Sequence, residues 1–319
     1  WRRCFKRLAG RPHWKRRGRD TVNLCEPHPK IWRLAGSTLH FPKLGPMRAV
    51  VHRPLEGRAK TCTIVQDGDQ WFASIVCEIE MTPPTPRTTP VVGIDRGLAA
   101  VVADSDGNLV SNPRHLERTA RRLAHAQRVV SRRKKGSRNR DKAKIRVMRL
   151  HRTVRRQRDH FLHVLAAAYA KSHGTVVVED LQIRNMARNH NLARAILDAG
   201  WGKFVGMLKY KQDWSGGRLV AVPAAYSSQT CSWCGHVDAR SRRSQSLFAC
   251  TACGIACHAD TNASIVIKQR FFAVEHTVTA CGGFPDVAGP AKQEQLVVTR
   301  ATRHRRSGAS QSPGLQAGD

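Results

Sequence analysis

Two cysteine pairs, Cys231-Ser-Trp-Cys234 and Cys250-Thr-Ala-Cys253, are separated by fifteen residues and are followed by Asp260. The two-residue gap within each pair lets both thiolates reach one ion, and Zn²⁺ prefers four such ligands in a tetrahedron. A glycine follows each pair, where it permits the tight turn of a zinc knuckle. The stretch therefore predicts a zinc ribbon over residues 227–257, with Cys231, Cys234, Cys250 and Cys253 as the zinc ligands.

The alternative interpretation of these cysteines is two disulfides or four separate buried thiols. It is disfavoured because the chain shows no apolar run of the roughly 18–20 residues that span a membrane, and no charged and apolar leader. A reducing, cytoplasmic location is the expectation that follows. Cys257 lies near the ribbon, but four better-spaced ligands already fill the zinc shell. The scattered cysteines are expected to be ordinary thiols: Cys4, Cys25, Cys62, Cys77 and Cys281.

The composition predicts a polyanionic partner. The 319 residues include 55 Lys and Arg against 23 Asp and Glu, which gives a formal net charge of +32. Such a surface attracts nucleic acid or an anionic membrane. Because the basic residues are spread over several segments and do not form one amphipathic helix, nucleic acid is favoured and no membrane partner is expected. A chain of this length is expected to carry two domains.

Residues 1–87 are expected to hold a basic segment followed by a small β-rich domain. The basic segment, residues 1–30, opens on Trp1, and the true beginning of the protein is expected to be missing. Short β-branched and apolar runs between residues 31 and 82 predict the strands of a small barrel or sandwich. The proline-rich stretch 83–90 is expected to be a stiff linker.

Residues 88–226 are expected to form the first part of an α/β domain. Two apolar runs, Val91–Asp95 and Gly174–Glu179, predict buried strands that each end in an acid, and the second suits a central parallel strand. Strands and helices follow each of them. The last helix of the domain is expected over residues 258–272, after the ribbon. Residues 273–319 are expected to be disordered because Gly, Pro, Ser, Gln and Arg dominate them.

Residues 113–172 predict two long helices joined by a turn at residues 136–139. Between Arg114 and Arg158 there are nineteen Lys and Arg and only two acids. Self-repulsion at this excess would weaken a helical hairpin unless counter-charge is bound, which favours a phosphate-binding surface over a merely solvated face. The residues expected to bind nucleic acid are Arg121, Arg122, Arg128, Arg132, Arg133, Lys134, Lys135, Arg138, Arg140, Lys142 and Lys144.

Three acids stand where charge is otherwise avoided: Asp95 and Glu179 close apolar strands, and Asp260 begins a helix. Active sites gather at the carboxyl ends of parallel strands, and carboxylates brought together raise one another's pKa. Two Mg²⁺ ions about 3.5–4 Å apart would relieve the repulsion, activate a water and stabilise the leaving 3′ oxygen of a phosphodiester. The alternative, surface acids or helix caps, is less favoured for all three together.

These residues resemble the three RuvC motifs of TnpB-like (OrfB) proteins, which insertion sequences encode and which are related to the type V CRISPR effectors. The likeness covers roughly residues 12–270. The motifs are Gly93-Ile94-Asp95-Arg96-Gly97, Val178-Glu179-Asp180-Leu181, and Cys250-Thr-Ala-Cys253-Gly254 with Asp260-Thr261-Asn262-Ala263. Family members begin with a further strand and a helical insert before the region that starts here. They often carry an acid where this chain has His258.

The resemblance implies an RNase H-like (RuvC) α/β domain with an inserted zinc ribbon and a long basic hairpin, preceded by a β-barrel-like wedge domain. It implies a DNA endonuclease directed by a guide RNA from the element's end to a target DNA. By the same resemblance Asp95, Glu179 and Asp260 are the catalytic ligands of Mg²⁺ or Mn²⁺, and the four ribbon cysteines hold structural zinc.

Two other functions stay open. A transposase that joins DNA ends by strand transfer would use the same metal chemistry, although such enzymes usually close their acidic triad with glutamate and this chain has Asp260. A non-catalytic nucleic-acid-binding protein would need the charge and the zinc, but it would not need three acids in this order.

Overall fold

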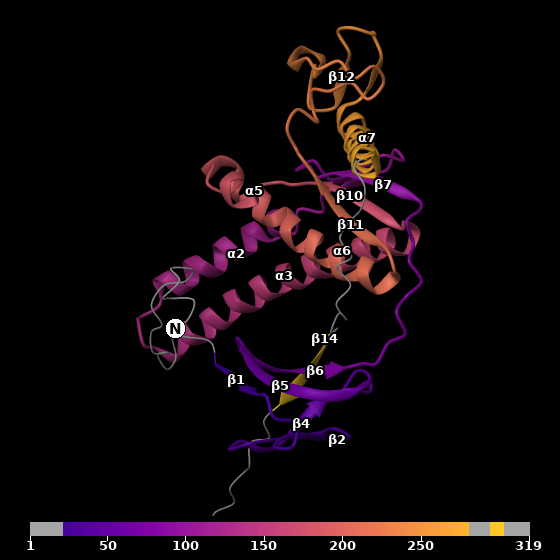
Figure 1. Ribbon diagram of the computed structural model, residues 1–319. Helices are drawn as coiled ribbons and strands as arrows, with labels where there is room; N and C mark the ends of the chain where they lie inside the picture. Colours follow the sequence, from indigo (N-terminus) through magenta and orange to yellow (C-terminus); the bar gives the residue numbers. More distant parts are fainter. Residues whose placement is uncertain (1–21, 281–293, 303–319) are drawn as a thin grey trace, which may run out of the picture. The chain divides into compact units, whose positions relative to one another are not determined.

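The computed structural model describes residues 22–280 and 294–302 (Figure 1). The chain divides into two compact units, one up to Met81 together with the residues from Gly289 onward, and one from Thr82 to Ala288. The division at Met81 lies just before the proline-rich stretch 83–90. In the described ranges, every helix is too short or too polar to cross a bilayer.

The first unit, as far as it is described, is an antiparallel sheet in the order β1-β5-β6-β14-β4-β3-β2. Its strands are β1 (Asn23–Glu26), β2 (Arg33–Ala35), β3 (Thr38–Phe41), β4 (Gly45–Val50), β5 (Arg58–Asp67), β6 (Gln70–Glu78) and β14 (Glu294–Thr302). Alternate side chains of the long strands are buried, Cys62 and Ile64 on β5 and Ala73, Ile75 and Cys77 on β6. This period of two is that of a sheet with one face on a core.

Strand β14 corrects the expectation that residues 273–319 are disordered throughout. It pairs antiparallel with β6 and with β4. Its Leu296-Val297-Val298 run favours a strand, but the Gly- and Pro-rich composition of the surrounding stretch concealed it. Helix α7 (Ala259–Ala280) also runs on past residue 272, where the last helix was expected to end. The remainder of the expected tail lies outside the described residues, as do Cys4, Cys281 and residues 1–21.

The second unit is built on a sheet whose strands, within the described residues, follow the order β11-β10-β7-β8-β9. The strands are β7 (Val91–Asp95), β8 (Ala100–Asp104), β9 (Leu109–Ser111), β10 (Thr175–Glu179) and β11 (Arg218–Val222). β10 runs parallel to both β7 and β11, whereas β7, β8 and β9 form an antiparallel meander. All of β10 is buried, which confirms the prediction of a central parallel strand.

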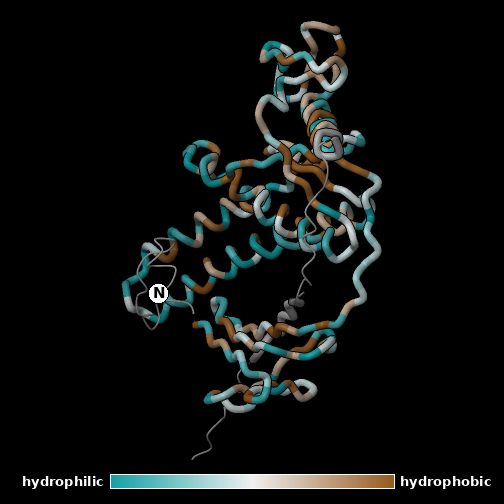
Figure 2. Tube along the Cα trace, viewed as in Figure 1, coloured by the Kyte–Doolittle hydropathy of each residue, from teal (hydrophilic) through white to brown (hydrophobic). Residues whose placement is uncertain are grey.

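The helices of this unit are α2 (His115–Arg132), α3 (Arg138–Ser172), α4 (Ile183–Met186), α5 (His190–Ala199), α6 (Trp201–Ser215) and α7. Three of them cover the two faces of the sheet. Leu162 of α3 and Phe204 of α6 join the core on one face, and Ile267 of α7 packs on the other. The strands between these layers include long hydrophobic stretches, whereas the hairpin helices α2 and α3 carry much hydrophilic sequence (Figure 2).

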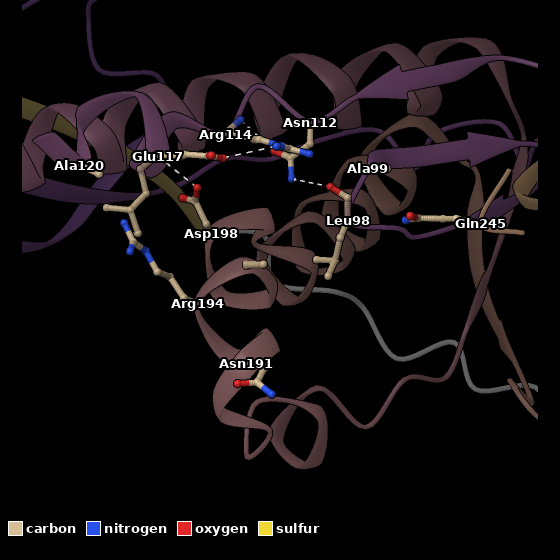
Figure 3. Close-up of a pocket in the computed structure, with 12 residues that line it drawn as sticks. Leu98, Ala99, Asn112, Arg114, Glu117, Ala120, Asn191, Arg194, Asp198 and Gln245 are labelled. Atoms are coloured by element: carbon tan, nitrogen blue, oxygen red, sulfur yellow. Dashed lines mark hydrogen bonds and ion pairs between the residues drawn. The ribbon is translucent and has the colours of Figure 1, made fainter.

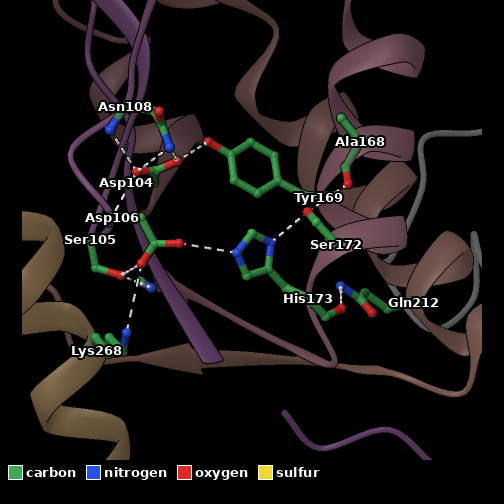
Figure 4. Close-up of polar contacts among 11 residues, drawn as sticks. Asp104, Ser105, Asp106, Asn108, Ala168, Tyr169, Ser172, His173, Gln212 and Lys268 are labelled. Carbon is green, nitrogen blue, oxygen red and sulfur yellow. Dashed lines mark hydrogen bonds and ion pairs between the residues drawn. The ribbon is translucent and has the colours of Figure 1, made fainter. Parts of the chain in front are cut away.

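The strand-to-strand turn between β8 and β9 ties the two helix layers together (Figure 4). The hydroxyl of Tyr169 on α3 donates to Asp104 Oδ2 at 2.8 Å, and burial raises the pKa of Tyr169. Asp106 lies 3.2 Å from Nε2 of His173, after α3, and 3.8 Å from Nζ of Lys268 on α7. One turn therefore connects α3 and α7, which lie on opposite faces of the sheet.

The ribbon is inserted between β11 and α7. Its hairpin consists of β12 (Leu247–Ala249) and β13 (Ala256–His258), which pair antiparallel. The side chain of Phe248 is fully buried beside Cys231, Cys250 and Ala259. This small core buries too little apolar surface to keep the ribbon folded by itself. A bound metal ion is expected to supply the remaining stability.

Helix α7 approaches strand β7 so closely that only glycine fits at position 93. A Cβ atom there would lie 2.2 Å from the carbonyl oxygen of Ser264 and 2.7 Å from the backbone nitrogen of Lys268. Both atoms belong to the helix backbone, so they move only if α7 moves. This contact fixes the first turn of α7, which carries Asp260, relative to Asp95 at the end of β7.

We expect Gly93→Ala to lower the free energy of unfolding by about 2–3 kcal/mol, because the added methyl group overpacks a backbone contact. Gly206→Ala is the matched control, since nothing lies within 4 Å of a Cβ at this position in α6. The control should gain about 0.5–1 kcal/mol from its better helix propensity. Urea denaturation measures both, and equal stability of the Gly93→Ala variant and the parent would contradict the close approach.

Candidate functional site

Asp95, Glu179 and Asp260 line one cavity of about 320 Å³. Two of them reach it because the parallel strands β7 and β10 end at the same edge of the sheet. The third reaches it from the first turn of α7. The fold thus brings together three acids that are 84 and 81 positions apart in the sequence (179 − 95 and 260 − 179).

Each of two acids already has a polar partner. Ser227, at the start of the ribbon, donates its hydroxyl hydrogen to Oε1 of Glu179. Oδ1 of Asp260 lies 3.0 Å from Nη2 of Arg242. The backbone N–H of Asp260 donates to Nδ1 of His258 at 3.3 Å, so His258 caps the start of α7. These contacts orient the carboxylates without neutralising all of them.

Among the acids of this cavity, Asp95 has the most strongly shifted pKa. Burial, and then the charges of Glu179 and Asp260, raise the pKa of Asp95 from 3.8 to about 7. Burial also raises the pKa of Glu179, against the hydrogen bond from Ser227 and the charge of Arg96. Oxygen ligands that repel one another in this way suit a hard divalent cation, and the three side chains fit such an ion by their donor atoms.

Arg242 is a functional candidate that sequence patterns did not indicate. It lies in the ribbon, yet its guanidinium reaches the acid cavity, where Nη2 donates to Asp260 and, at 3.2 Å, to the carbonyl oxygen of Gln245. A guanidinium beside a carboxylate site is well placed for phosphate oxygens, which it binds in a planar, bidentate manner. Arg240 and Arg243 stand on either side in the sequence, so no local signal marks Arg242.

Arg96 is a second such candidate, although it lies within the Gly93–Gly97 motif. Only 6% of its surface is exposed, and Nη2 donates to the backbone oxygen of Glu179. Its Nε has no hydrogen-bond partner within the described residues. Burial lowers the pKa of Arg96, and the charges of Glu179 and Asp95 oppose that shift. Because a guanidinium stays protonated in proteins, a positive charge sits beside the acids.

The four ribbon cysteines form a separate cluster whose Sγ atoms all lie within 4.8 Å of one another. The Sγ atoms of Cys231 and Cys253 are 3.7 Å apart, and those of Cys234 and Cys250 are 3.6 Å apart. A ZnS₄ tetrahedron with bonds of about 2.3 Å has edges of about 3.8 Å. The cluster therefore fits a zinc ion. Among the described residues it is the one group of potential ligands this tight, and the carboxylates are more widely spaced.

Within the cluster Cys250 is favoured as a thiolate, whereas, against a backbone hydrogen bond from Ile255, burial and hydrogen bonds with the other thiols raise the pKa of Cys253 to about 12. Backbone N–H groups of Ala252 and Cys253 donate to Sγ of Cys250 at 3.4 and 3.5 Å. The hydrogen bond from Cys253 is the main cause that lowers the pKa of Cys250 to about 6. Cys257 is half-buried and outside the cluster, and burial raises its pKa. Cys62 and Cys77 belong to the core of the first unit, and Cys25 is exposed there.

Helix α7 holds the first cysteine knuckle directly. Asn262 accepts from the Ser232 N–H at 2.9 Å and donates to the carbonyl oxygen of Thr230 at 2.8 Å. Two turns further along the same face of the helix, Gln269 donates to the carbonyl oxygen of Ser232 at 2.7 Å. The residues that grip the knuckle therefore start two positions after Asp260, so the cysteine cluster and the acid cavity share one helix.

The predicted nucleic-acid-binding residues of the hairpin run from the middle of α2, where Arg121 and Arg122 lie, through the turn to the start of α3. All eleven are exposed except Arg140, which is half-buried. None of them lines the acid cavity. These residues, which we call the hairpin tip, are therefore separate from the three acids.

We expect Cys231→Ser to lose most of its bound zinc, because three thiolates and a hydroxyl hold the ion far less tightly than four thiolates. Cys257→Ser, a cysteine of the same ribbon outside the cluster, is the matched control and should keep one zinc per chain. Elemental analysis of the purified proteins measures the metal content. Equal zinc content in both variants would contradict the assignment of the ligands.

We expect Asp95→Asn to stabilise the Mg²⁺-free protein at alkaline pH. A carboxyl whose pKa is raised by folding destabilises the folded state as the pH rises from about 4 through about 7. The variant and the parent should therefore melt alike near pH 4 and differ by on the order of 4 kcal/mol at pH 8. Thermal melts with zinc retained measure this, with Asp180→Asn as the control. A difference that shrinks as the pH rises would contradict the burial of Asp95.

Two family profiles match the chain. OrfB_IS605, described as "Probable transposase", matches residues 74–190, and "Cas12f1-like, TNB domain" matches residues 201–267. The OrfB_IS605 profile covers both Asp95 and Glu179. The second covers the ribbon, Arg242 and Asp260.

Named relatives extend this likeness over most of the chain. It is 34% identical over 317 residues to "Putative RNA-guided DNA endonuclease InsQ" of Escherichia coli (strain K12), covering 95% of this chain and 78% of that protein. It is 40% identical over 234 residues to a "Putative RNA-guided DNA endonuclease" of Streptomyces pristinaespiralis, covering 72% of this chain and 57% of that one. The chain thus spans little more than half of the Streptomyces relative.

A solved chain is also similar. It comes from the "Cryo-EM structure of the Cas12f1-sgRNA-target DNA complex", with a TM-score of 0.41 and 14% identity, covering 84% of this chain and 74% of that one.

Proposed function

This chain belongs to the family of RNA-guided DNA endonucleases that includes InsQ of Escherichia coli, and on this premise we propose that it is a divalent-metal-dependent nuclease that cuts DNA under the direction of a guide RNA. The observation that carries the proposal is the meeting of Asp95, Glu179 and Asp260 in one cavity with the guanidinium of Arg242. Phosphodiester hydrolysis by a metal-dependent nuclease requires acids that hold divalent ions, and a guanidinium beside them can bind the phosphate.

Asp95, Glu179 and Asp260 would hold Mg²⁺ or Mn²⁺, which, when bound, supplies an activated water and stabilises the leaving 3′ oxygen. Ser227 and Arg96 position Glu179 through its carboxylate and its backbone oxygen. Arg242 is held at the cavity by Asp260, where its guanidinium would bind a phosphate oxygen of the DNA strand. The cysteine cluster would hold structural zinc and, through α7, keep Asp260 in place.

The sheet of the second unit supports the finer proposal of an RNase H-like (RuvC) domain. Its acids lie at the end of the first strand of the meander, at the end of the adjacent parallel strand, and at the start of the last helix. The ribbon is inserted immediately before that helix. We assign the antiparallel first unit to the wedge domain that the family resemblance implies.

The hairpin tip is the proposed grip on nucleic acid. Its exposed Lys and Arg residues crowd a short length of two antiparallel helices, and counter-charge from phosphates relieves their repulsion. Since the tip is separate from the acid cavity, it would hold the guide RNA or its pairing with target DNA, while the cavity receives the strand that is cut. A divided arrangement of this kind is the usual one when base pairing supplies the sequence specificity.

We expect Glu179→Gln to abolish Mg²⁺-dependent cleavage of a guide-matched DNA duplex, with a fall in rate of at least about a thousandfold. Binding of the guide RNA should stay within about twofold, because glutamine still accepts the Ser227 hydrogen bond and the hairpin tip is untouched. Asp180→Asn, an exposed acid outside the cavity, is the matched control and should keep most of the rate.

Rates measured from labelled DNA, with RNA affinity from filter binding, separate the outcomes. Cleavage by the Glu179→Gln variant at the parent's rate would remove Glu179 from the chemistry. Loss of RNA binding instead would make it a structural residue. A parent that binds RNA and DNA but cuts neither would indicate a non-catalytic binding protein.

The match to a family described as "Probable transposase" favours one second candidate, DNA strand transfer. Both reactions would use the same three acids, so the site does not separate them. The products do, because strand transfer leaves DNA joined to a new 3′ end, whereas hydrolysis leaves free ends. Sequencing of the products of the parent reaction therefore distinguishes the two.

A further inference from the structure

A second pocket, of about 570 Å³, adjoins the acid cavity (Figure 3). It lies between the segment that follows β7, the start of α2 and one face of α5. Leu98, Ala99 and Gln245 line both hollows, so the two share a wall. We call this second hollow the flanking pocket. A group bound in it is an immediate neighbour of a group bound at the acids.

The flanking pocket offers apolar surfaces with polar groups at its rim. Leu98, Leu116 and Ala195 supply aliphatic surface. Asn191 supplies an amide from α5, and the amide of Gln245 lies across the pocket from the guanidinium of Arg194 (Figure 3). The flat face of a base buries apolar surface against aliphatic side chains, and amides both donate to and accept from the edges of bases.

The charges of the pocket also favour an anionic chain. Its two acids are already engaged, since Asp198 pairs with Arg158 and accepts from the Leu116 N–H at 3.2 Å, while Glu117 lies 3.5 Å from Arg114. Arg194 is exposed and makes no ion pair with any acid in the described part of the chain. One uncommitted positive charge therefore remains at the rim, where a phosphate would meet it.

We propose that the flanking pocket holds the nucleoside that adjoins the phosphate at the acid cavity, as an unpaired base of a single DNA strand. This rests on the proposed function, since it takes the acids to be the place of the reacting phosphate. The base lies against the aliphatic wall, its edge meets the amides of Asn191 and Gln245, and the next phosphate along the strand meets Arg194. The volume is within the roughly 300–1,000 Å³ of ordinary ligand sites.

The pocket gives the enzyme a contact that depends on a base and not only on phosphates. Covering about 55 Å² of the apolar surface of a base with the aliphatic wall is worth about 1.4 kcal/mol, which is a factor of ten in affinity. A strand that lacks the base at this one position should therefore be held, and cut, about tenfold less well. Base pairing would hide the base from the pocket, so only an opened strand fits.

The test fills the pocket from an exposed position of α5. Ala195→Trp places an indole where the base is proposed to lie, whereas Leu197→Trp adds the same side chain to the same helix outside the pocket, at a residue that is 61% exposed. The probe is a pentanucleotide of single-stranded DNA containing 2-aminopurine, titrated against each full-length protein by fluorescence. We expect about tenfold weaker binding for Ala195→Trp and unchanged binding for Leu197→Trp.

Melting temperature and zinc content establish that both variants are folded. If Ala195→Trp fails to fold, Arg194→Gln replaces it, because an exposed side chain is changed; about threefold weaker binding with a shallower dependence on salt is then expected. Equal affinity of the tested pocket variant and the parent for the pentanucleotide overturns the proposal.

Cleavage separates this proposal from the proposed function. Guide-matched targets with a single abasic nucleoside moved through the cut region should be cut about tenfold more slowly by the parent at one position next to the cut. Ala195→Trp should lose that dependence. A parent that cuts every abasic target equally well overturns the pocket proposal. A parent that cuts no DNA, while the pentanucleotide still distinguishes the two tryptophan variants, overturns the nuclease function and retains the pocket.

Discussion

Asp95 cannot ionise in the folded chain at the pH where an exposed aspartate does, because it is buried beside Glu179 and Asp260. The chain cannot relax this repulsion by letting Asp260 retreat, since α7 is pressed against β7 at Gly93 with no room for even a methyl group. A proton or a cation must therefore relieve it. The packing of one helix on one strand thus creates both the fold of the second unit and the demand for positive charge at its edge.

Positive charge is supplied to that edge in two ways. Arg96 is built into the motif that carries Asp95 and cannot leave, because it is buried and bonded to the backbone of Glu179. Arg242 comes from the ribbon and is half-buried, so it is free to exchange Asp260 for another anion. The first sets a permanent electrostatic background. Arg242 links the position of the ribbon to the anion that is bound in the acid cavity.

The parts of this protein that could be predicted have local signals. The cysteine spacing, the apolar run that ends at Glu179 and the basic helices each fit within one element. The parts that could not be predicted depend on distant segments. Strand β14 is recognised by its pairing with β6, over 200 residues earlier, in a stretch of otherwise loop-like composition. Arg242 looks like its basic neighbours, and the flanking pocket exists only where four segments converge.

Besides the contacts of its first knuckle with α7, the ribbon is attached to the acids at both ends and from within. Ser227 is bonded to Glu179 where the ribbon begins, Asp260 follows where it ends, and Arg242 returns to Asp260 from within it. A change of length within the ribbon should therefore be poorly tolerated among related chains. Between Arg242 and Asp260 it would pull a guanidinium away from the carboxylate that it must reach. Between Cys234 and Asp238 it would break the backbone hydrogen bonds that join His236 to Cys231 and Asp238 to Gln229.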